Sequence, residues 1–146
     1  MIKISTRAIK ALASITDITG TIERGVKNAA YEIGRETEKE SKRLIQSGTR
    51  SGRIYKIRGA THQASAPGES PAEFSGELSK SIKYNVKGTD EIKLTATTPY
   101  AAKLELGPKD EPEKARPYLS RAFENRTQQN LRTLEYHVVK AISKRL

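Results

Sequence analysis

Residues 18–44, ITGTIERGVKNAAYEIGRETEKESKRL, decide the fold of this chain because they carry the period of a long helix. Apolar or small residues recur there at steps of three or four, the spacing of one helix face: Ile18, Ile22, Val26, Ala29, Ile33, Thr37, Ser41 and Leu44. Charged residues on the opposite side form attractive pairs three or four positions apart. The pattern predicts a helix of about 28 residues, roughly 40 Å long, that ends near Gly48. Gly25 and Gly34 weaken a helix, so we expect them to allow a neighbouring element to pack closely.

Two strands later in the chain add a β component. Residues 82–86 and 92–96 alternate apolar with polar side chains, and KGTDE between them supplies turn residues. This pattern is typical of an antiparallel hairpin with one face in water. A second β-prone run, residues 54–57, lies between glycines and predicts a strand or half of a hairpin.

Shorter helical segments and a final long helix complete the chain. A helix of one to two turns is expected at 98–106, where Thr98 is a cap and Pro99 takes the first position, and another short one at 75–81. Pro117 is expected to open the final helix. Its apolar stripe comprises Leu119, Phe123, Thr127, Leu131, Leu134, Val138, Ala141 and Ile142. We therefore predict one α+β domain over residues 1–146, with long N-terminal and C-terminal helices packed on a small antiparallel β-sheet, short helices and an extended proline-rich loop.

Residues 1–16 are expected to form an N-terminal segment before the long helix. An edge strand is predicted at residues 2–4, and Ser5 is a suitable cap for a short helix that runs to about Ser14. The segment is basic and contains no acidic residue, as in a transit peptide, but it lacks the continuous apolar core of a secretory signal. We interpret it as an ordinary helix.

Composition limits the classes of function. Apolar residues make up 35% of the chain and aromatic residues 5%, without tryptophan, so the core should be thin and neighbours in an assembly should add stability. The 27 basic and 17 acidic residues give a formal charge of +10, which favours polyanionic partners unless it serves only solubility. The lack of cysteine excludes disulfides and thiolate metal ligands. No apolar run approaches the ~20 residues that cross a bilayer.

Residues 47–76 are expected to be a mobile hairpin followed by an extended arm, because prolines restrict the backbone to extended conformations. The basic residues of the hairpin rim are candidates for contact with nucleic acid or a partner protein: Arg50, Arg53, Lys56 and Arg58. We name these four residues the basic rim. Candidates for a subunit or partner interface are Tyr55, Pro67, Pro71 and Phe74.

Candidate catalytic residues do not form a recognisable set. His62, Glu69 and Glu73 lie close in sequence, but one histidine without cysteine is too few ligands for a metal site. As an acid–base pair they lack a nucleophile motif. Ser75 lacks the flanking glycine spacing of a nucleophile elbow, and His137 borders an apolar stripe, where a packing role is expected. We predict no catalytic residue, metal ligand or cofactor.

Several short motifs occur in a specific order along the chain: APGE at 66–69, SGEL at 75–78, YA at 100–101, LELG at 104–107 and RPYL at 116–119. In this order they resemble the tail-completion, or head–tail joining, proteins of long-tailed bacteriophages and related prophages. The similarity extends from the long helix to the C-terminus. The loop from Ser47 to Thr61 has no distinctive pattern.

The resemblance implies a non-enzymatic virion protein. Members of that family form a ring in the neck, between the head-completion (connector) proteins and the tail terminator or tail tube, around the channel through which DNA passes. It therefore implies a ring oligomer, weak transient contact with genomic DNA, no membrane partner, and a place in the virion after assembly in the host cytoplasm. The basic rim would then face the DNA channel or the next ring. The alternatives are a small basic nucleic-acid-binding domain and, for completeness, a small hydrolase that uses His62 and a glutamate.

Overall fold

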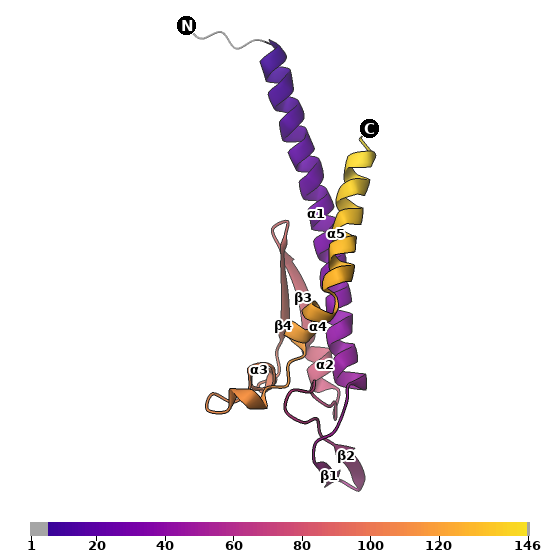
Figure 1. The fold of residues 1–146 in the computed structure, drawn as a ribbon, viewed down its shortest axis with the longest axis vertical. Coiled ribbons are helices and arrows are strands. Elements are labelled where there is room, and N and C mark those ends of the chain that lie inside the picture. The colour runs from indigo at the N-terminus through magenta and orange to yellow at the C-terminus, as the bar shows by residue number, and fades with distance from the viewer. Residues whose placement is uncertain (1–5, 146) are drawn as a thin grey trace.

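The longest element is a single helix that forms the spine of the molecule. The computed structural model describes the backbone of residues 6–145 and the side chains of residues 17–145. Helix α1, Thr6–Ser47, has 42 residues and is roughly 60 Å long at 1.5 Å per residue. Figure 1 shows α1 continuing beyond the C-terminal end of the other long helix.

The expectation of two separate helices before Gly48 was wrong. Helix α1 passes without a break through the region between Ser14 and Ile18. No proline or glycine lies between these two residues, so no backbone constraint interrupts the hydrogen-bond ladder. The strand predicted at 2–4 and the Ser5 cap lie outside the described residues.

Within the residues that the structure describes, the β-structure consists of two separate antiparallel hairpins. Strands β3, Ile82–Lys87, and β4, Glu91–Ala96, pair as the alternation predicted, with Tyr84 opposite Leu94. Strand β1, Ile54–Ile57, pairs with β2, Ala60–Gln63, which the sequence did not single out. Between β1 and β2, Arg58 and Gly59 both have positive φ, 49° and 82°. Two consecutive residues of this kind form the tight turn preferred in two-residue hairpins.

The helices after the arm are short, except for the last. They are α2, Glu77–Ser81; α3, Ala101–Leu106; the 3₁₀ turn η1, Pro112–Lys114; α4, Leu119–Asn125; and α5, Thr127–Ser143. The single final helix predicted from Pro117 is therefore two helices. The helix breaks at Arg126, whose N–H donates to the carbonyl of Phe123 at 3.2 Å. The Thr127 hydroxyl donates to the same carbonyl at 3.1 Å, and such back-bonding bends helices.

The core is small and lies where α1 ends. It contains Ile45, Leu78, Ile82, Ala101 and Tyr118, contributed by α1, α2, β3, α3 and the residue before α4. Tyr118 is fully buried, and burial, with the nearby Glu105 carboxylate, raises its pKa to about 12. The thin core predicted from composition is thus concentrated at one end of an elongated molecule (Figure 1).

Two glycines of α1 set its distance from the neighbouring elements, as expected. A Cβ on Gly34 would lie 2.5 Å from the ring of Tyr84, and one on Gly25 would lie 2.9 Å from the carbonyl oxygen of His137. The Tyr84 N–H also donates to the Glu38 carboxylate at 2.9 Å. Gly34 therefore allows β3 to pack on α1, and Gly25 allows α5 to do so.

Candidate interaction surfaces

The proline-rich arm is attached to the segment before α4. The Gly68 N–H donates to the carbonyl of Ala115 at 2.8 Å, and the Ser70 hydroxyl donates to the carbonyl of Pro117 at 3.0 Å. The Arg121 guanidinium donates to the carbonyl of Gly68 at 2.7 Å. These bonds hold the arm along its own chain. The mobility expected for residues 47–76 stays a prediction.

Glu105 caps helix α4 from a distant part of the sequence. Its carboxylate accepts the backbone N–H groups of Tyr118, Leu119 and Ser120 at 2.8, 2.9 and 2.9 Å, and the Ser120 hydroxyl at 2.6 Å. Tyr118, at the cap position, makes no side-chain cap of its own. Burial acts to raise the pKa of Glu105, but these hydrogen bonds outweigh it and the pKa is lowered. The LELG and RPYL motifs therefore meet in space and form one structural unit.

The residues considered as a catalytic set, His62, Glu69 and Glu73, each interact with a different partner. Glu69 accepts the hydroxyl and N–H of Ser51 at 2.5 and 3.0 Å, and these contacts lower its pKa. Glu73 accepts the hydroxyl of Ser79. The His62 ring packs edge-on against the Phe74 ring, with centroids 5.0 Å apart. Within the described part of the chain, no group of three or more His, Asp or Glu residues is arranged to hold a metal ion.

The candidate interface residues differ in exposure. Pro71 is buried and Pro67 is exposed, while Tyr55 is 46% and Phe74 58% exposed. Phe74 therefore does not pack into the core of its own chain, because the arm places it on the surface beside His62. Its burial against a neighbouring subunit stays a prediction. A shallow groove of about 460 Å³ adjoins Phe74.

All four residues of the basic rim are exposed. These residues lie on and beside hairpin β1–β2, which is at the end of the molecule opposite the first turns of α1 (Figure 1). The Arg50 guanidinium donates to the carbonyl of Gln46 at 3.1 Å. None of the four forms an ion pair with a carboxylate among the residues that the structure describes. Their contact with DNA or a partner protein stays a prediction.

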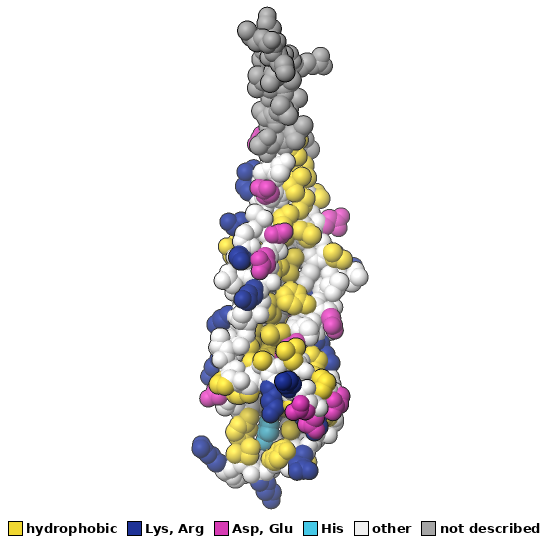
Figure 2. Space-filling model, turned by 90° about the vertical axis from the view of Figure 1, so that its left-hand side faces the viewer, with side chains coloured by type: hydrophobic (Ala, Val, Ile, Leu, Met, Phe, Trp, Pro, Cys, Tyr) yellow, Lys and Arg dark blue, Asp and Glu magenta, His cyan; other side chains and the backbone are white. Residues whose placement is uncertain are grey.

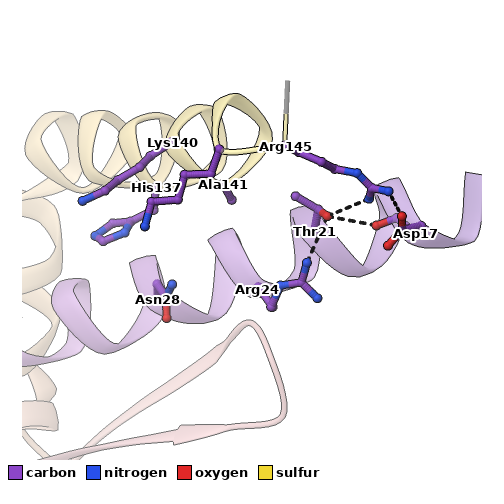
Figure 3. Close-up of a pocket in the computed structure, with 9 residues that line it drawn as sticks. Asp17, Thr21, Arg24, Asn28, His137, Lys140, Ala141 and Arg145 are labelled. Atoms are coloured by element: carbon purple, nitrogen blue, oxygen red, sulfur yellow. Dashed lines mark hydrogen bonds and ion pairs between the residues drawn. The ribbon is translucent and has the colours of Figure 1, made fainter. Parts of the chain in front are cut away.

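A second basic surface was not identified from the sequence. It is a groove of about 600 Å³ between α1 and α5, which we name the α1–α5 groove (Figure 3). Its cationic lining residues are Arg24, Lys140, Lys144 and Arg145. Arg24 lies on α1 and the other three lie at or just after the end of α5, so only antiparallel packing of α5 on α1 brings these cations together.

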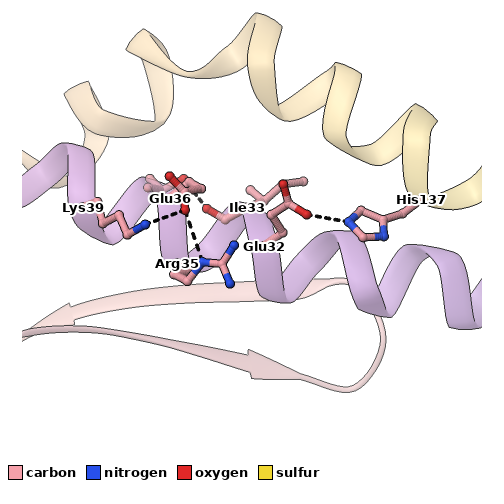
Figure 4. Close-up of polar contacts among 7 residues, drawn as sticks. Glu32, Ile33, Arg35, Glu36, Lys39 and His137 are labelled. Carbon is pink, nitrogen blue, oxygen red and sulfur yellow. Dashed lines mark hydrogen bonds and ion pairs between the residues drawn. The ribbon is translucent and has the colours of Figure 1, made fainter.

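His137 connects the two walls of the α1–α5 groove. Its Nε2 lies 2.6 Å from a carboxylate oxygen of Glu32 on α1, and the imidazole is 17% exposed (Figure 4). One turn further along α1, Glu36 accepts hydrogen bonds from Lys39 and Arg35, and these contacts lower its pKa. The expected packing role of His137 thus includes a polar contact between helices.

No described helix combines the length and the apolar character needed to cross a bilayer. No protein-family model, curated protein or solved structure matches the chain significantly. The surfaces described above and the motif resemblance are therefore the basis for a functional proposal.

Proposed function

We propose that this protein is a non-enzymatic structural component of the neck of a long-tailed bacteriophage, where it forms a ring around the DNA channel and joins head to tail. The resemblance of its short motifs to tail-completion proteins supports this assignment. Its partners would be other copies of itself, the head-completion or connector proteins, and the tail terminator or tail-tube protein. Genomic DNA would make only weak, transient contact as it passes. The protein would reach the virion neck after assembly in the host cytoplasm.

The observation that carries the proposal is the amount of large apolar surface that the chain leaves uncovered. On α1 and α5 the exposed large apolar or aromatic residues are Ile18, Ile22, Tyr31, Leu131, Tyr136 and Val139. In the arm, the β1–β2 hairpin and α3 region they are Ile54, Tyr55, Phe74, Tyr100 and Leu106. Figure 2 shows hydrophobic side chains in a band along the long axis. Large exposed apolar patches mark interaction sites, so neighbouring subunits would cover surface that this chain does not bury itself.

The elongated shape supports the same proposal. A helix of 42 residues in a chain of 146 presents a long side surface relative to its small core. Small cores leave domains marginally stable, and oligomerisation is one of the remedies. The chain is thus suited to pack side by side with copies of itself.

Deletion of the gene from an inducible prophage that carries it tests the proposal. We expect electron microscopy to show DNA-filled heads and separate tails, because a joining protein acts after packaging. Complementation with the wild-type gene should restore joined particles. Normal joined virions from the deletion strain would contradict the proposal.

A small basic nucleic-acid-binding domain is the alternative, and the two basic surfaces favour it. It predicts a monomer that binds DNA with nanomolar affinity at physiological salt. Mass photometry together with a DNA-binding salt series separates the two functions. A ring or partner-dependent oligomer with weak DNA binding favours the neck protein.

A further inference from the structure

The α1–α5 groove is built from residues that each helix repeats on one face. Helix α1 contributes Asp17, Thr21, Arg24 and Asn28, at intervals of four, three and four residues, and this spacing places them on one side of the helix. Helix α5 contributes His137 and Lys140, and Lys144 and Arg145 follow directly after its last residue. Figure 3 shows Lys140 and His137 extending from α5 toward α1, and Arg24 and Arg145 both bonded to Thr21. The groove therefore runs along the helix pair.

Positive charge dominates this groove. Asp17 is its only acidic lining residue among those described, and its carboxylate is paired with Arg145. Arg24 and Lys144 form no ion pair with any carboxylate in residues 17–145. Lys140 donates to the phenolic oxygen of Tyr136 at 3.0 Å and lies 5.1 Å from the centre of that ring. Three cations are thus available to an external anion.

A buried hydroxyl positions two guanidinium groups at one end of the groove. Thr21 is 3% exposed, and its hydroxyl donates to the carbonyl of Asp17 at 3.0 Å. The Thr21 hydroxyl oxygen also accepts hydrogen bonds from the guanidinium groups of Arg24 at 3.1 Å and of Arg145 at 3.0 Å. A guanidinium has five N–H donors, so the single bond to Thr21 leaves most donors of Arg24 free for a ligand, whereas Arg145 also pairs with Asp17. Less side-chain entropy is then lost when an anion binds.

We propose that the α1–α5 groove binds the phosphate backbone of a nucleic acid. Positioned guanidinium groups match phosphate oxygens through paired N–H donors. Lys140 and Lys144 are one helical turn apart, about 6 Å along the axis, which is comparable with the separation of neighbouring phosphates in a strand. The groove is open and elongated, as a polymer requires. This site goes beyond the proposed function, in which the basic rim was the candidate for DNA contact.

An acidic protein surface is less well matched to this groove. Carboxylates on a folded protein would have to lie at the same regular spacing, whereas phosphates repeat along every nucleic-acid strand. A contact confined to the phosphate backbone carries no information about base sequence. Binding should therefore be independent of sequence and should weaken with salt.

Fluorescence anisotropy with a labelled 20-base-pair duplex, measured over a salt series, tests the proposal. The groove variant is Arg24→Gln/Lys140→Gln/Lys144→Gln. A matched control, Lys87→Gln/Lys93→Gln/Lys109→Gln, removes the same charge from exposed sites on the β3–β4 hairpin and the loop after α3. We expect the groove variant to bind at least tenfold more weakly at low salt and the control less than threefold. The slope of log K against log[salt] should become shallower by about 2 to 3 in the groove variant, since each lost phosphate contact contributes about 0.9.

Equal losses in the groove variant and the control would overturn the proposal, because net charge alone would then explain binding. Competition by polyglutamate as effective as competition by unlabelled duplex would also overturn it in favour of an acidic protein partner. Thermal unfolding by circular dichroism should be the same for all variants. If the triple variant melts earlier, Lys144→Glu at an exposed site supplies the test, and unchanged binding by that variant would reject the groove. Mass photometry reports ring formation separately from DNA binding. A protein that forms a ring but does not bind DNA through the groove would reject only this inference. A monomer that binds DNA through the groove would reject only the proposed ring.

Discussion

At the scale of single residues, Glu105 shows how one side chain can organise two segments. It lies in α3, yet it accepts three consecutive N–H groups at the start of α4. Those N–H groups have no partners within their own helix. The side chain of Glu105 in LELG and the backbone of RPYL therefore stabilise each other within a single chain. This contact does not require a partner protein.

Glu105→Gln should destabilise the protein by about 1 to 2 kcal/mol at neutral pH, the usual range for a helix cap with a charged acceptor. The folded state lowers the pKa of Glu105 from its ordinary value of 4.5. A lowered pKa means that this stabilisation is present above 4.5 and is lost as the pH falls through the folded-state value. The difference between wild type and variant in urea unfolding should therefore be largest at pH 7 and shrink below about pH 4.5. Glu113→Gln, at an exposed site in η1, is the control. A pH-independent difference would reject the role of the ionised carboxylate.

At the scale of the elements, helix α1 packs differently against β3 and against α5. β3 packs where Gly34 leaves room for the Tyr84 ring, and α5 packs where Gly25 leaves room for its backbone. The glycines weaken α1 as an isolated helix, so their presence is explained by packing and not by helix propensity.

Gly34→Ala should destabilise the protein by about 1 to 3 kcal/mol, because the new methyl group would overlap the Tyr84 ring. Gly20→Ala in the same helix is the matched control. Its Cβ would meet only a guanidinium nitrogen of Arg24 at 4.0 Å, so the higher helix propensity of alanine should stabilise α1 by up to about 1 kcal/mol. Urea unfolding followed at 222 nm measures both. The proposed role of Gly34 in packing is wrong if the Gly34→Ala variant is as stable as the Gly20→Ala variant.

At the scale of the whole molecule, the chain combines a core at one end with apolar and basic surfaces elsewhere. Phe74 and Leu106 are more than half exposed, as is Leu131 on the opposite half of the molecule. In the proposed ring, neighbouring subunits would cover part of this apolar surface. The proposed ring and the proposed DNA-binding role of the α1–α5 groove make separate predictions for the whole molecule.

Phe74→Ala should leave the melting temperature of the isolated chain nearly unchanged but reduce self-association. The side chain is 58% exposed and its main described contact is the His62 ring, so its loss should cost about 1 kcal/mol or less within the chain. Burial against a neighbour would instead make it important for assembly. Mass photometry over a concentration series measures the change, with Thr61→Ala on the exposed part of β2 as control. An unaltered oligomer distribution would remove Phe74 from the interface.

Local patterns alone predicted much of the fold. The 3.6-residue period of residues 18–44 and the alternation in residues 82–96 appear in α1 and in the β3–β4 hairpin. Gly25 and Gly34 were expected to allow close packing, and they do. Such features could be predicted because helix and strand periodicities, turns and glycine effects depend on residues close together in the sequence.

The remaining features depend on the tertiary structure because they join residues far apart in the chain. Glu105 reaches residues 118–120, and the arm bonds to residues 115–121. The α1–α5 groove likewise exists only because α5 returns along α1 and brings Arg145 to Thr21, a pairing across 124 positions. Periodicity identifies which residues share a face of a helix, but it does not identify the element that packs against that face. The sequence by itself therefore determined the elements and their faces, and only their packing decided which polar and charged side chains meet.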